Sequence, residues 1–536
     1  MKDIVISPID ITIILVYIVG ITLWGLAYSR KKTKNKTHED YFLAGRKMTW
    51  PIIGITLYAA NMGSPALVGL AGDAYSTGIS VFNYEWMALV VLVFFAIFFL
   101  PFYLRSKVYT MPEFLQRRFD IRSRYYFSFI TLVGNIIIDT AGILYSGAII
   151  VKMVFPSLEL WQIVAILALI TAAYTITGGL SAVMYTEAVQ GVLLMLGAVF
   201  LTFFALQKIN FDIPRIFAET PKSMLSLIRP MSDKSMPWLG LVIGVPLLGF
   251  YFWGTNQFMV QRVLSAKNTD HGRWGALFAG VLKLPGLFIV VFPGIIGRML
   301  YPNLPSPDLI YPTMLFNLLP VGILGIVLAG LIAAISSSIS ATLNSASTLM
   351  TMDFVSNLRP GLKPKQLVRI GQIFTGIFVI ISAAWSPLIA DFSSLFKYLQ
   401  MVLALISPPV VAVFLLGLFW KRSNATGAFS GLIGGFIFTL FTVYVRFINP
   451  AAFPWLAHIQ FLLVAPVLLT VTAFIIVPIS LLTPPPPVEA IANYTWSRKF
   501  FKEESLMLEG TPWYKNYRFQ AIAALAVTFI LVYYFR

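Results

Sequence analysis

Apolar segments long enough to cross a lipid bilayer follow one another along most of this chain. A hydrocarbon core of about 30 Å needs roughly 20 predominantly apolar residues per helix. Fourteen such segments can be marked in the 536 residues. They lie near 9–29, 50–70, 81–104, 125–153, 161–179, 185–207, 239–259, 274–299, 314–352, 368–388, 394–419, 426–446, 458–483 and 517–535. The sequence therefore predicts an all-α, multi-pass membrane protein with both termini on one side.

The net charge of +17 would suggest a nucleic-acid partner in a soluble protein, but the positions of the basic residues give it another meaning. The connector 30–47 carries seven Lys and Arg residues, and the positive-inside rule places such a loop in the cytoplasm. Both termini are then expected outside, and most basic residues fall on connectors predicted to be cytoplasmic. We therefore expect a protein of the cell (inner) membrane, surrounded by lipid, with no nucleic-acid partner and no obligatory protein partner.

Two predicted spans are interrupted by polar, Gly and Pro residues. The first break is AANMGSPALVG at 59–69, and the second is GVPLLGFYFWGTNQ at 244–257. Irregular backbone at membrane depth is tolerated only where protein or a water-filled cavity surrounds it. If each break opens a unit of five helices, the second unit is inverted relative to the first, which is typical of transporters whose broken helices bind substrate and ions. An ordinary kink at one break is the alternative.

Few charged side chains fall inside the predicted spans: Glu85, Asp139, Glu187, Lys283 and Lys397. Such residues usually face a cavity or a partner. Lys283 lies about nine residues into its span, roughly 13 Å by helical rise, which is too deep for easy snorkelling. Glu85 can accept two hydrogen bonds from neighbouring hydroxyls, as on a sugar or polyol. A purely structural Glu85–Lys283 ion pair is the alternative, and Lys397 is close enough to a span end to snorkel.

The predicted ninth span contains the hydroxyl-rich stretch AAISSSISATLNSAS at 333–347. Small hydroxyl residues allow helices to approach closely in a membrane, so packing alone explains part of this pattern. The alternative is that hydroxyl and carbonyl oxygens here bind a monovalent cation.

Several ordered motifs carry a resemblance that covers nearly the whole chain. They are EDYFLAGR (39–46), AANMGS (59–64), YEWM (84–87), YTITGGLSAVMYTEAVQ (174–190), NQFMVQRVLSAK (256–267), NSASTLMTMDF (344–354) and AVFLLGLFWKR (412–422). At these residues the chain resembles the sodium:solute symporter family, and most of all its sodium–glucose and sodium–galactose cotransporter branch.

The resemblance implies a LeuT-type fold that works by alternating access, with about 14 transmembrane helices in a single transporter domain, 1–536. In this arrangement 9–29 is a leading extra helix, 50–207 is the first five-helix repeat and 239–419 is the inverted second repeat. The remaining segment, 426–535, supplies peripheral helices.

The resemblance also implies ion and solute sites. Its sodium ligands are the carbonyls of Ala59, Met62 and Ala334 and the hydroxyls of Ser337 and Ser338. Glu187 and Ser340 match a second sodium site or exit path, where a shorter acid is usual and Ala341 lacks a hydroxyl, so we expect one sodium. The implied substrate-binding residues are Asn61, Tyr84, Glu85, Phe252, Trp253, Lys283 and Gln400.

Two positions depart from the sugar-carrier pattern, because Ala66 and Gly249 stand where polar side chains are usual. Both changes enlarge the expected pocket and remove hydrogen bonds. Asp139 has no counterpart role in the family. We therefore expect sodium-coupled symport of a small hydroxylated solute, with a monosaccharide such as glucose or galactose as the leading expectation. Inositol, a sialic acid or a nucleoside is the alternative solute.

Other function classes fit less well. The chain has no cysteine and three histidines, His38, His271 and His458, each near a predicted loop or span end. No paired acids, metal-ligand spacing or phosphate-binding loop accompanies them, so the sequence predicts that the protein is not an enzyme. A sodium-responsive sensor or channel-like uniporter stays open, although no signalling module is expected after residue 484.

Overall fold

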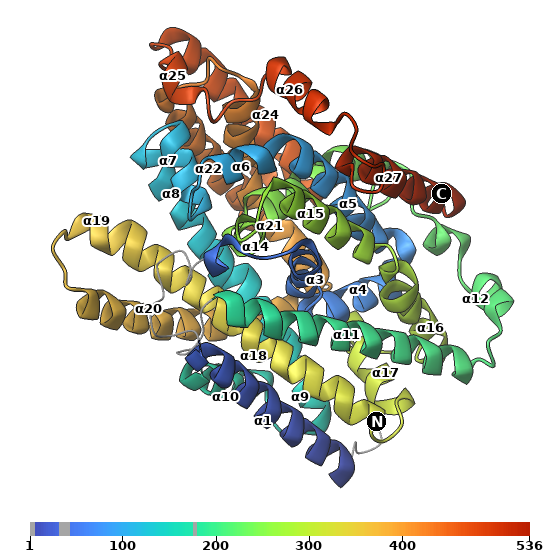
Figure 1. The fold of residues 1–536 in the computed structure, drawn as a ribbon. Helices are drawn as coiled ribbons and strands as arrows, with labels where there is room; N and C mark the ends of the chain where they lie inside the picture. The colour runs from blue at the N-terminus through green and yellow to red at the C-terminus, as the bar shows by residue number, and fades with distance from the viewer. Residues whose placement is uncertain (1–5, 32–42, 175–179) are drawn as a thin grey trace.

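The computed structural model describes residues 6–31, 43–174 and 180–536, and these ranges fold into one helical assembly (Figure 1). Within them no β-strand forms beyond two isolated bridges, Met48–Ala266 and Arg229–Pro237. Part of the predicted cytoplasmic connector, with His38 and most of its basic run, lies outside the described residues, as does the end of the predicted fifth span. The predicted all-α class is confirmed for the described chain.

The longer helices account for most of the chain. Their bounds are α1 Pro8–Lys31, α3 Trp50–Asn61, α4 Ser64–Thr77, α5 Asn83–Phe94, α8 Ile121–Val133, α9 Ala141–Val154, α10 Leu160–Tyr174, α11 Leu180–Lys208, α15 Thr269–Lys283, α16 Phe292–Leu300, α18 Ile323–Leu349, α20 Pro364–Trp385, α21 Leu395–Phe419, α22 Ala425–Phe447, α24 Phe461–Leu482, α26 Arg498–Leu508 and α27 Tyr517–Tyr534. Shorter helices are α6 Leu100–Arg105, α7 Met111–Arg118, α12 Ile213–Glu219, α13 Val245–Phe250, α14 Gln257–Leu264, α17 Ile310–Leu318, α19 Ser356–Leu358, α23 Pro454–His458 and α25 Val488–Ile491.

Ten helices in the described ranges are long and apolar enough to cross a membrane, or eleven if a bent pair counts as one span. The predicted number of fourteen and the side on which the termini lie stay predictions. One predicted boundary is wrong, because 314–352 is not a single span. It contains the end of α17 and all of α18, separated at 319–322, where Gly322 adopts a φ of 90°. Pro320 and this left-handed glycine stop one helix before the next begins.

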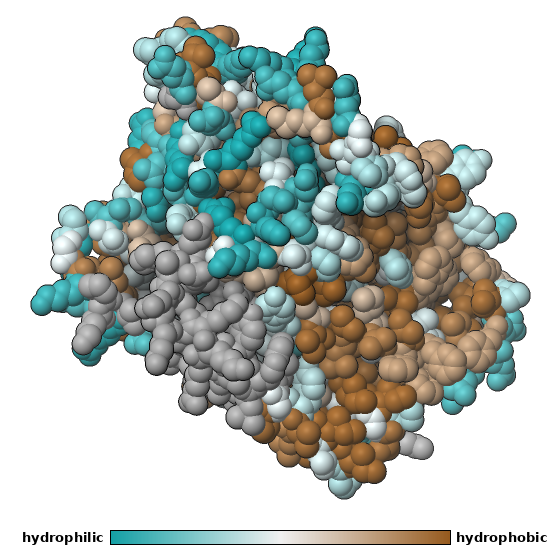
Figure 2. All heavy atoms as spheres, in the orientation of Figure 1, coloured by the Kyte–Doolittle hydropathy of each residue, from teal (hydrophilic) through white to brown (hydrophobic). Residues whose placement is uncertain are grey.

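The outer surface fits a lipid environment over much of its area. Figure 2 shows brown, apolar residues across the lower right of the molecule and teal residues gathered at its upper end. Exposed apolar side chains on several helices include Val16, Leu169, Ile380, Phe474 and Ile522. A water-soluble protein rarely exposes such large contiguous apolar area, whereas a bilayer solvates it.

The first predicted break is a bent helix pair. α3 ends at Asn61 and α4 begins at Ser64, with an angle of 59° between them. Pro65 lies in the first turn of α4, where its missing N–H costs no helical hydrogen bond. The regular helix is therefore interrupted at Met62 and Gly63.

The second predicted break falls at Asn256. A helical segment from Gly240 to Thr255 stops there, because Asn256 is extended, with φ −63° and ψ 126°. Its side chain accepts a hydrogen bond from the Phe258 N–H and so caps α14. The hydroxyl of Tyr103 donates to the Gly254 carbonyl at 3.0 Å, which satisfies one carbonyl freed by the break. Both predicted interruptions are thus real changes of helix direction or geometry.

Several spans also contain short π-helical stretches, which locally add a residue to the helical turn. Two of them matter for the site: η5, Gly134–Thr140, and η8, Tyr251–Thr255. π-Helical turns in α-helices occur often at functional sites, because they turn side chains away from the regular packing surface.

Candidate functional site

A cavity of about 140 Å³ lies where the two broken helices meet. Its lining comes from segments far apart in sequence: α3, α4, α5, η5, α9, α13, η8, α14, α18 and α21. Six of the seven predicted substrate-binding residues line it: Asn61, Tyr84, Glu85, Phe252, Trp253 and Gln400. The two departures from the sugar-carrier pattern, Ala66 and Gly249, line the same space.

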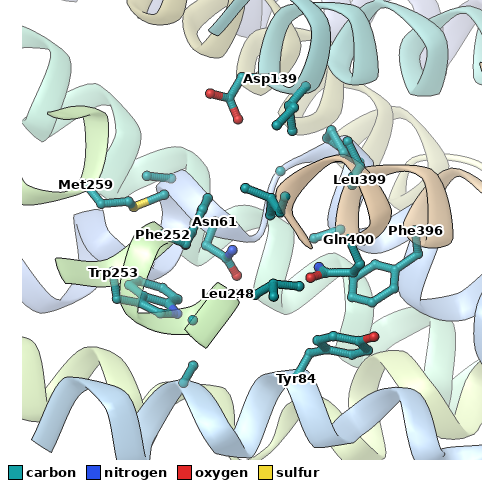
Figure 3. Close-up of a pocket in the computed structure, with 18 of the residues that line it drawn as sticks. Asn61, Tyr84, Asp139, Leu248, Phe252, Trp253, Met259, Phe396, Leu399 and Gln400 are labelled. Carbon is teal, nitrogen blue, oxygen red and sulfur yellow. The ribbon is translucent and has the colours of Figure 1, made fainter. Parts of the chain in front are cut away.

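The polar and aromatic groups of the cavity face a shared interior (Figure 3). Asn61 ends α3 at the first break, and Gln400 comes from α21 on the opposite wall. Phe252 and Trp253 lie just before the second break, with their rings 5.2 Å apart and nearly perpendicular. Tyr84 packs edge-on against Phe396, with ring centres 5.0 Å apart. Side-chain amides between aromatic faces are suited to a small solute with several hydroxyl groups.

Lys283 lies behind this wall and does not line the cavity. Its side chain is fully buried (0% exposed) and its ammonium donates to Glu85 Oε2 at 2.7 Å and to the amide oxygen of Asn61. The rings of Tyr58 and Trp253 each lie 5.6 Å from Nζ, near enough for cation–π attraction. The Glu85–Lys283 ion pair, which the sequence analysis gave as an alternative to substrate binding, is therefore present. Glu85 and Asn61 lie between Lys283 and the cavity.

The predicted sodium ligands lie on two elements that border the same cavity. Ser338 lines it together with Ala60, Asn61 and Gly63 from the first break. Ala59, Met62 and Ala334 are buried. Ser337 donates to Gln190 Oε1 at 2.8 Å and to the Ala334 carbonyl at 3.2 Å. The predicted ligands thus come from the α3–α4 break and from α18, and Ser340 lies half-buried on α18.

Gln190 is a residue that the sequence did not single out. It lies on α11 and is 5% exposed. Its oxygen accepts the Ser337 proton, which leaves the Ser337 oxygen free to face a cation. The one sequence feature that could have indicated a role for Gln190 is its position at the end of the motif MYTEAVQ.

Glu187, the other predicted cation residue, is held in an ion pair. Arg262 Nη2 lies 2.7 Å and 2.6 Å from its two carboxylate oxygens, and both side chains are buried. Arg262 also donates to the Phe258 carbonyl and lies over the Phe258 ring at 4.1 Å. The pair joins α11 to α14, the helix after the second break. The sequence analysis assigned no role to Arg262, although it follows the second break within the motif NQFMVQRVLSAK.

A second network that the sequence missed joins α4, α9 and α21 around Asp308. The Asp308 carboxylate accepts the N–H of Leu395, at the start of α21, at 2.9 Å, and the hydroxyl of Tyr145 at 3.4 Å. Ser394 donates to Asp73 on α4 at 3.4 Å. Burial, opposed by the Leu395 N–H, raises the pKa of Asp308 to about 7.

This pKa predicts a pH-dependent contribution to stability. The folded protein keeps a proton on Asp308 that the unfolded chain releases, so the contribution falls as pH rises from about 4 to about 7 and is lost above that. Asp308→Asn should therefore flatten the dependence of the unfolding temperature on pH between 5 and 7.5. Thermal unfolding in detergent measures it, with Asp270→Asn, an exposed carboxylate of α15, as the control. Equal pH slopes in wild type and Asp308→Asn would contradict this assignment.

Similarity to known proteins agrees with this geometry. The model of the sodium:solute symporter family matches residues 41–435. This chain belongs to that family. It is 35% identical to sodium/glucose cotransporter 4 of Danio rerio, over 94% of this chain and 83% of that protein. It is also 35% identical to sodium/myo-inositol cotransporter 2 of Oryctolagus cuniculus, over 91% of this chain and 79% of that protein. The predicted family membership is confirmed.

Solved structures show the same fold. A sodium-coupled sialic acid symporter in a substrate-bound outward-open state gives a TM-score of 0.74 at 22% identity, over 89% of this chain and 99% of that one. The nucleobase-cation-symport-1 family transporter Mhp1, in a closed conformation, gives 0.54 at 13% identity, over 86% and 99%. These likenesses confirm the LeuT-type fold for this symporter-family chain.

Proposed function

We propose that this protein is a sodium-coupled symporter of a small hydroxylated solute, with monosaccharides as the leading class, in the cell (inner) membrane. The observation that carries the proposal is the cavity at the meeting point of two broken helices, walled by Asn61, Glu85 and Gln400. Its family and its relatives named for sodium/glucose and sodium/myo-inositol cotransport support it. We further propose two inverted repeats, 50–207 and 239–419, within about 14 spans and with both termini outside.

The solute is held by hydrogen bonds and ring contacts in this proposal. Asn61 and Gln400 each offer amide donors and an acceptor, and Glu85 offers carboxylate oxygens. Phe252 and Trp253 supply apolar ring faces for the carbon skeleton of a sugar or polyol. Lys283 keeps Glu85 and Asn61 in place from behind.

In this proposal the sodium gradient drives solute uptake. The carbonyls of Ala59, Met62 and Ala334 and the hydroxyls of Ser337 and Ser338 bind it, and Glu187 with Ser340 forms a second ion site or an exit path. An ion between the α3–α4 break and α18 favours the conformation in which these elements are close. Coupling then follows, because sodium binds one conformation better and so raises the affinity of that conformation for the solute.

A polyol such as inositol is the second candidate solute. The 35% identity to a sodium/myo-inositol cotransporter favours it, and the small side chains of Ala66 and Gly249 leave more room in the cavity. A sialic acid and a nucleoside are the remaining candidate solutes.

Uptake into proteoliposomes tests the proposal. A panel of labelled monosaccharides, polyols, sialic acid and nucleosides is offered under an inward sodium gradient. The molecular mass of the solute recovered from the vesicles is then measured by mass spectrometry. We expect accumulation above the outside concentration, with solute mass unchanged, and none under an equal potassium gradient. Equal uptake in sodium and potassium would contradict the proposed sodium coupling. A changed molecular mass of the solute would indicate an enzyme.

Ser338→Ala should raise the sodium concentration for half-maximal uptake by about tenfold, because one of the proposed oxygen ligands is lost and a buried polar contact of this kind accounts for about 1–2 kcal/mol. The measurement is the sodium dependence of uptake at fixed solute. Ser336→Ala is the matched control, since two residues rotate the side chain by roughly 200° around α18. An unchanged sodium dependence in Ser338→Ala would take Ser338 out of the ion site.

A further inference from the structure

The cavity wall carries one carboxylate that the proposed function does not use. Asp139 lies on η5 and lines the same space as Asn61 and Gln400. Figure 3 shows its carboxylate turned toward the interior, across from Met259. Asp139 thus borders the same cavity as Asn61 and Gln400.

The other acidic groups near the cavity are already neutralised. Glu85 pairs with Lys283, and Glu187 pairs with Arg262. No Lys, Arg or His lines the cavity in the described chain. Within the same ranges Asp139 makes no hydrogen bond or ion pair. Of the two carboxylates that line the described cavity, Glu85 has a cationic partner and Asp139 has none.

The surroundings of Asp139 make the lack of a cationic partner costly. The cavity wall around it is largely apolar, with Ile138, Ile143, Leu399 and Leu403 among its lining residues. A carboxylate at membrane depth needs a partner, because so little water is available to solvate it. A positively charged group inside the cavity would supply that partner.

The atoms near Asp139 favour an organic ammonium over a second metal ion. A hard cation needs several oxygen ligands around it. The hydroxyl of Thr342, on the same wall, is already hydrogen-bonded to Thr140 at 3.0 Å and to the Ser338 carbonyl at 3.0 Å. An ammonium needs only the carboxylate and a few acceptors.

We propose that the cavity takes solutes bearing a protonated amine as well as hydroxyl groups, the amino-sugar and amino-polyol class, with Asp139 contacting the ammonium. The hydroxyl groups contact Asn61 and Gln400, as in the proposed function, on which this inference rests. Each transport cycle then carries one more positive charge with such a solute than with its neutral parent.

The test compares three solutes that differ only at the amine: a neutral sugar, the corresponding amino sugar and its N-acetyl derivative. Sodium-driven uptake is measured in proteoliposomes with the wild-type protein. We expect the amino sugar to half-saturate at a concentration about tenfold lower than the other two, because only it presents a positive charge to Asp139. Charge moved per solute, from current and label recorded together, should be one unit larger for the amino sugar.

Asp139→Asn should bring the half-saturation of the amino sugar close to that of the neutral sugar. Asp212→Asn, an exposed carboxylate in the connector after α11, controls for the change in overall charge. Asp139→Glu, which keeps the charge, should retain the preference in part.

The possible results separate the hypotheses. No preference for the amino sugar in wild type overturns the inference, even if the variants fail to fold. A preference that persists in Asp139→Asn also overturns it. If Asp139→Asn instead alters sodium dependence with the neutral sugar, Asp139 belongs to a second ion site, which overturns the ammonium assignment. If none of the three solutes is taken up with sodium while another panel member is, the amine inference fails alone; if nothing is taken up, the proposed function fails.

Discussion

Lys283→Met should abolish solute uptake and lower the free energy of unfolding by about 3–5 kcal/mol, because it leaves the Glu85 carboxylate buried without its partner. Lys283 also donates to Asn61, so the substitution removes a group that fixes two cavity residues at once. The measurements are sodium-driven uptake and thermal unfolding of the purified protein. Lys363→Met, in the connector before α20, is the control for loss of a lysine.

The double variant Glu85→Gln with Lys283→Met separates the two roles of the pair. Replacing both members of a buried ion pair is often neutral for stability, so the double variant should unfold near the wild-type temperature. Uptake should stay low, because Glu85 and Lys283 no longer define the polar wall. Wild-type affinity for the solute in either single variant would show that the pair has no role in binding.

Arg262→Met should produce the second large effect, about 3–5 kcal/mol of lost stability with loss of coupled uptake. The guanidinium holds Glu187 with two short contacts and also reaches the Phe258 carbonyl, so its loss separates α14 from α11. Both helices meet near the end of the cavity that we predict to face the cytoplasm. Solvent access from that side should therefore increase.

A cysteine reporter measures that access. The chain has no cysteine, so Met259→Cys gives a single thiol on the cavity wall. We expect a thiol reagent added from the predicted cytoplasmic side to label this reporter faster in Arg262→Met than in the Arg262 background. Arg262→Lys keeps the charge but loses the two-point contact, so its labelling should be intermediate. Equal labelling rates in all three proteins would exclude a gating role for the Glu187–Arg262 pair.

Hydropathy was sufficient to predict the all-α membrane class. A membrane helix satisfies its own backbone hydrogen bonds, so the segments that can span a bilayer are recognisable from local composition. The two breaks were also visible locally, since Asn61, Gly63 and Pro65 stand out against apolar neighbours, as does Asn256. The division between α17 and α18 was missed, because two adjoining apolar helices look like one in a hydropathy reading.

The cavity residues illustrate how far motif resemblance extends. It selected Asn61, Tyr84, Glu85, Phe252, Trp253 and Gln400, and the fold brings these six around one cavity. Their roles in binding stay predictions until uptake is measured. The resemblance gave no role to Asp139, and only the structure places that carboxylate in the lining of the same cavity as Asn61 and Gln400.

By itself the sequence determined the membrane class, the positions of the helix breaks and the family, because each depends on local composition or on ordered motifs. Only the tertiary structure decided the partners of the buried charges. Glu85 and Lys283 are 198 positions apart and Glu187 and Arg262 are 75 apart, yet each pair is in direct contact. The physical reason is that a buried charge is satisfied by whichever group the packing of distant helices brings to it, and no local pattern encodes that packing.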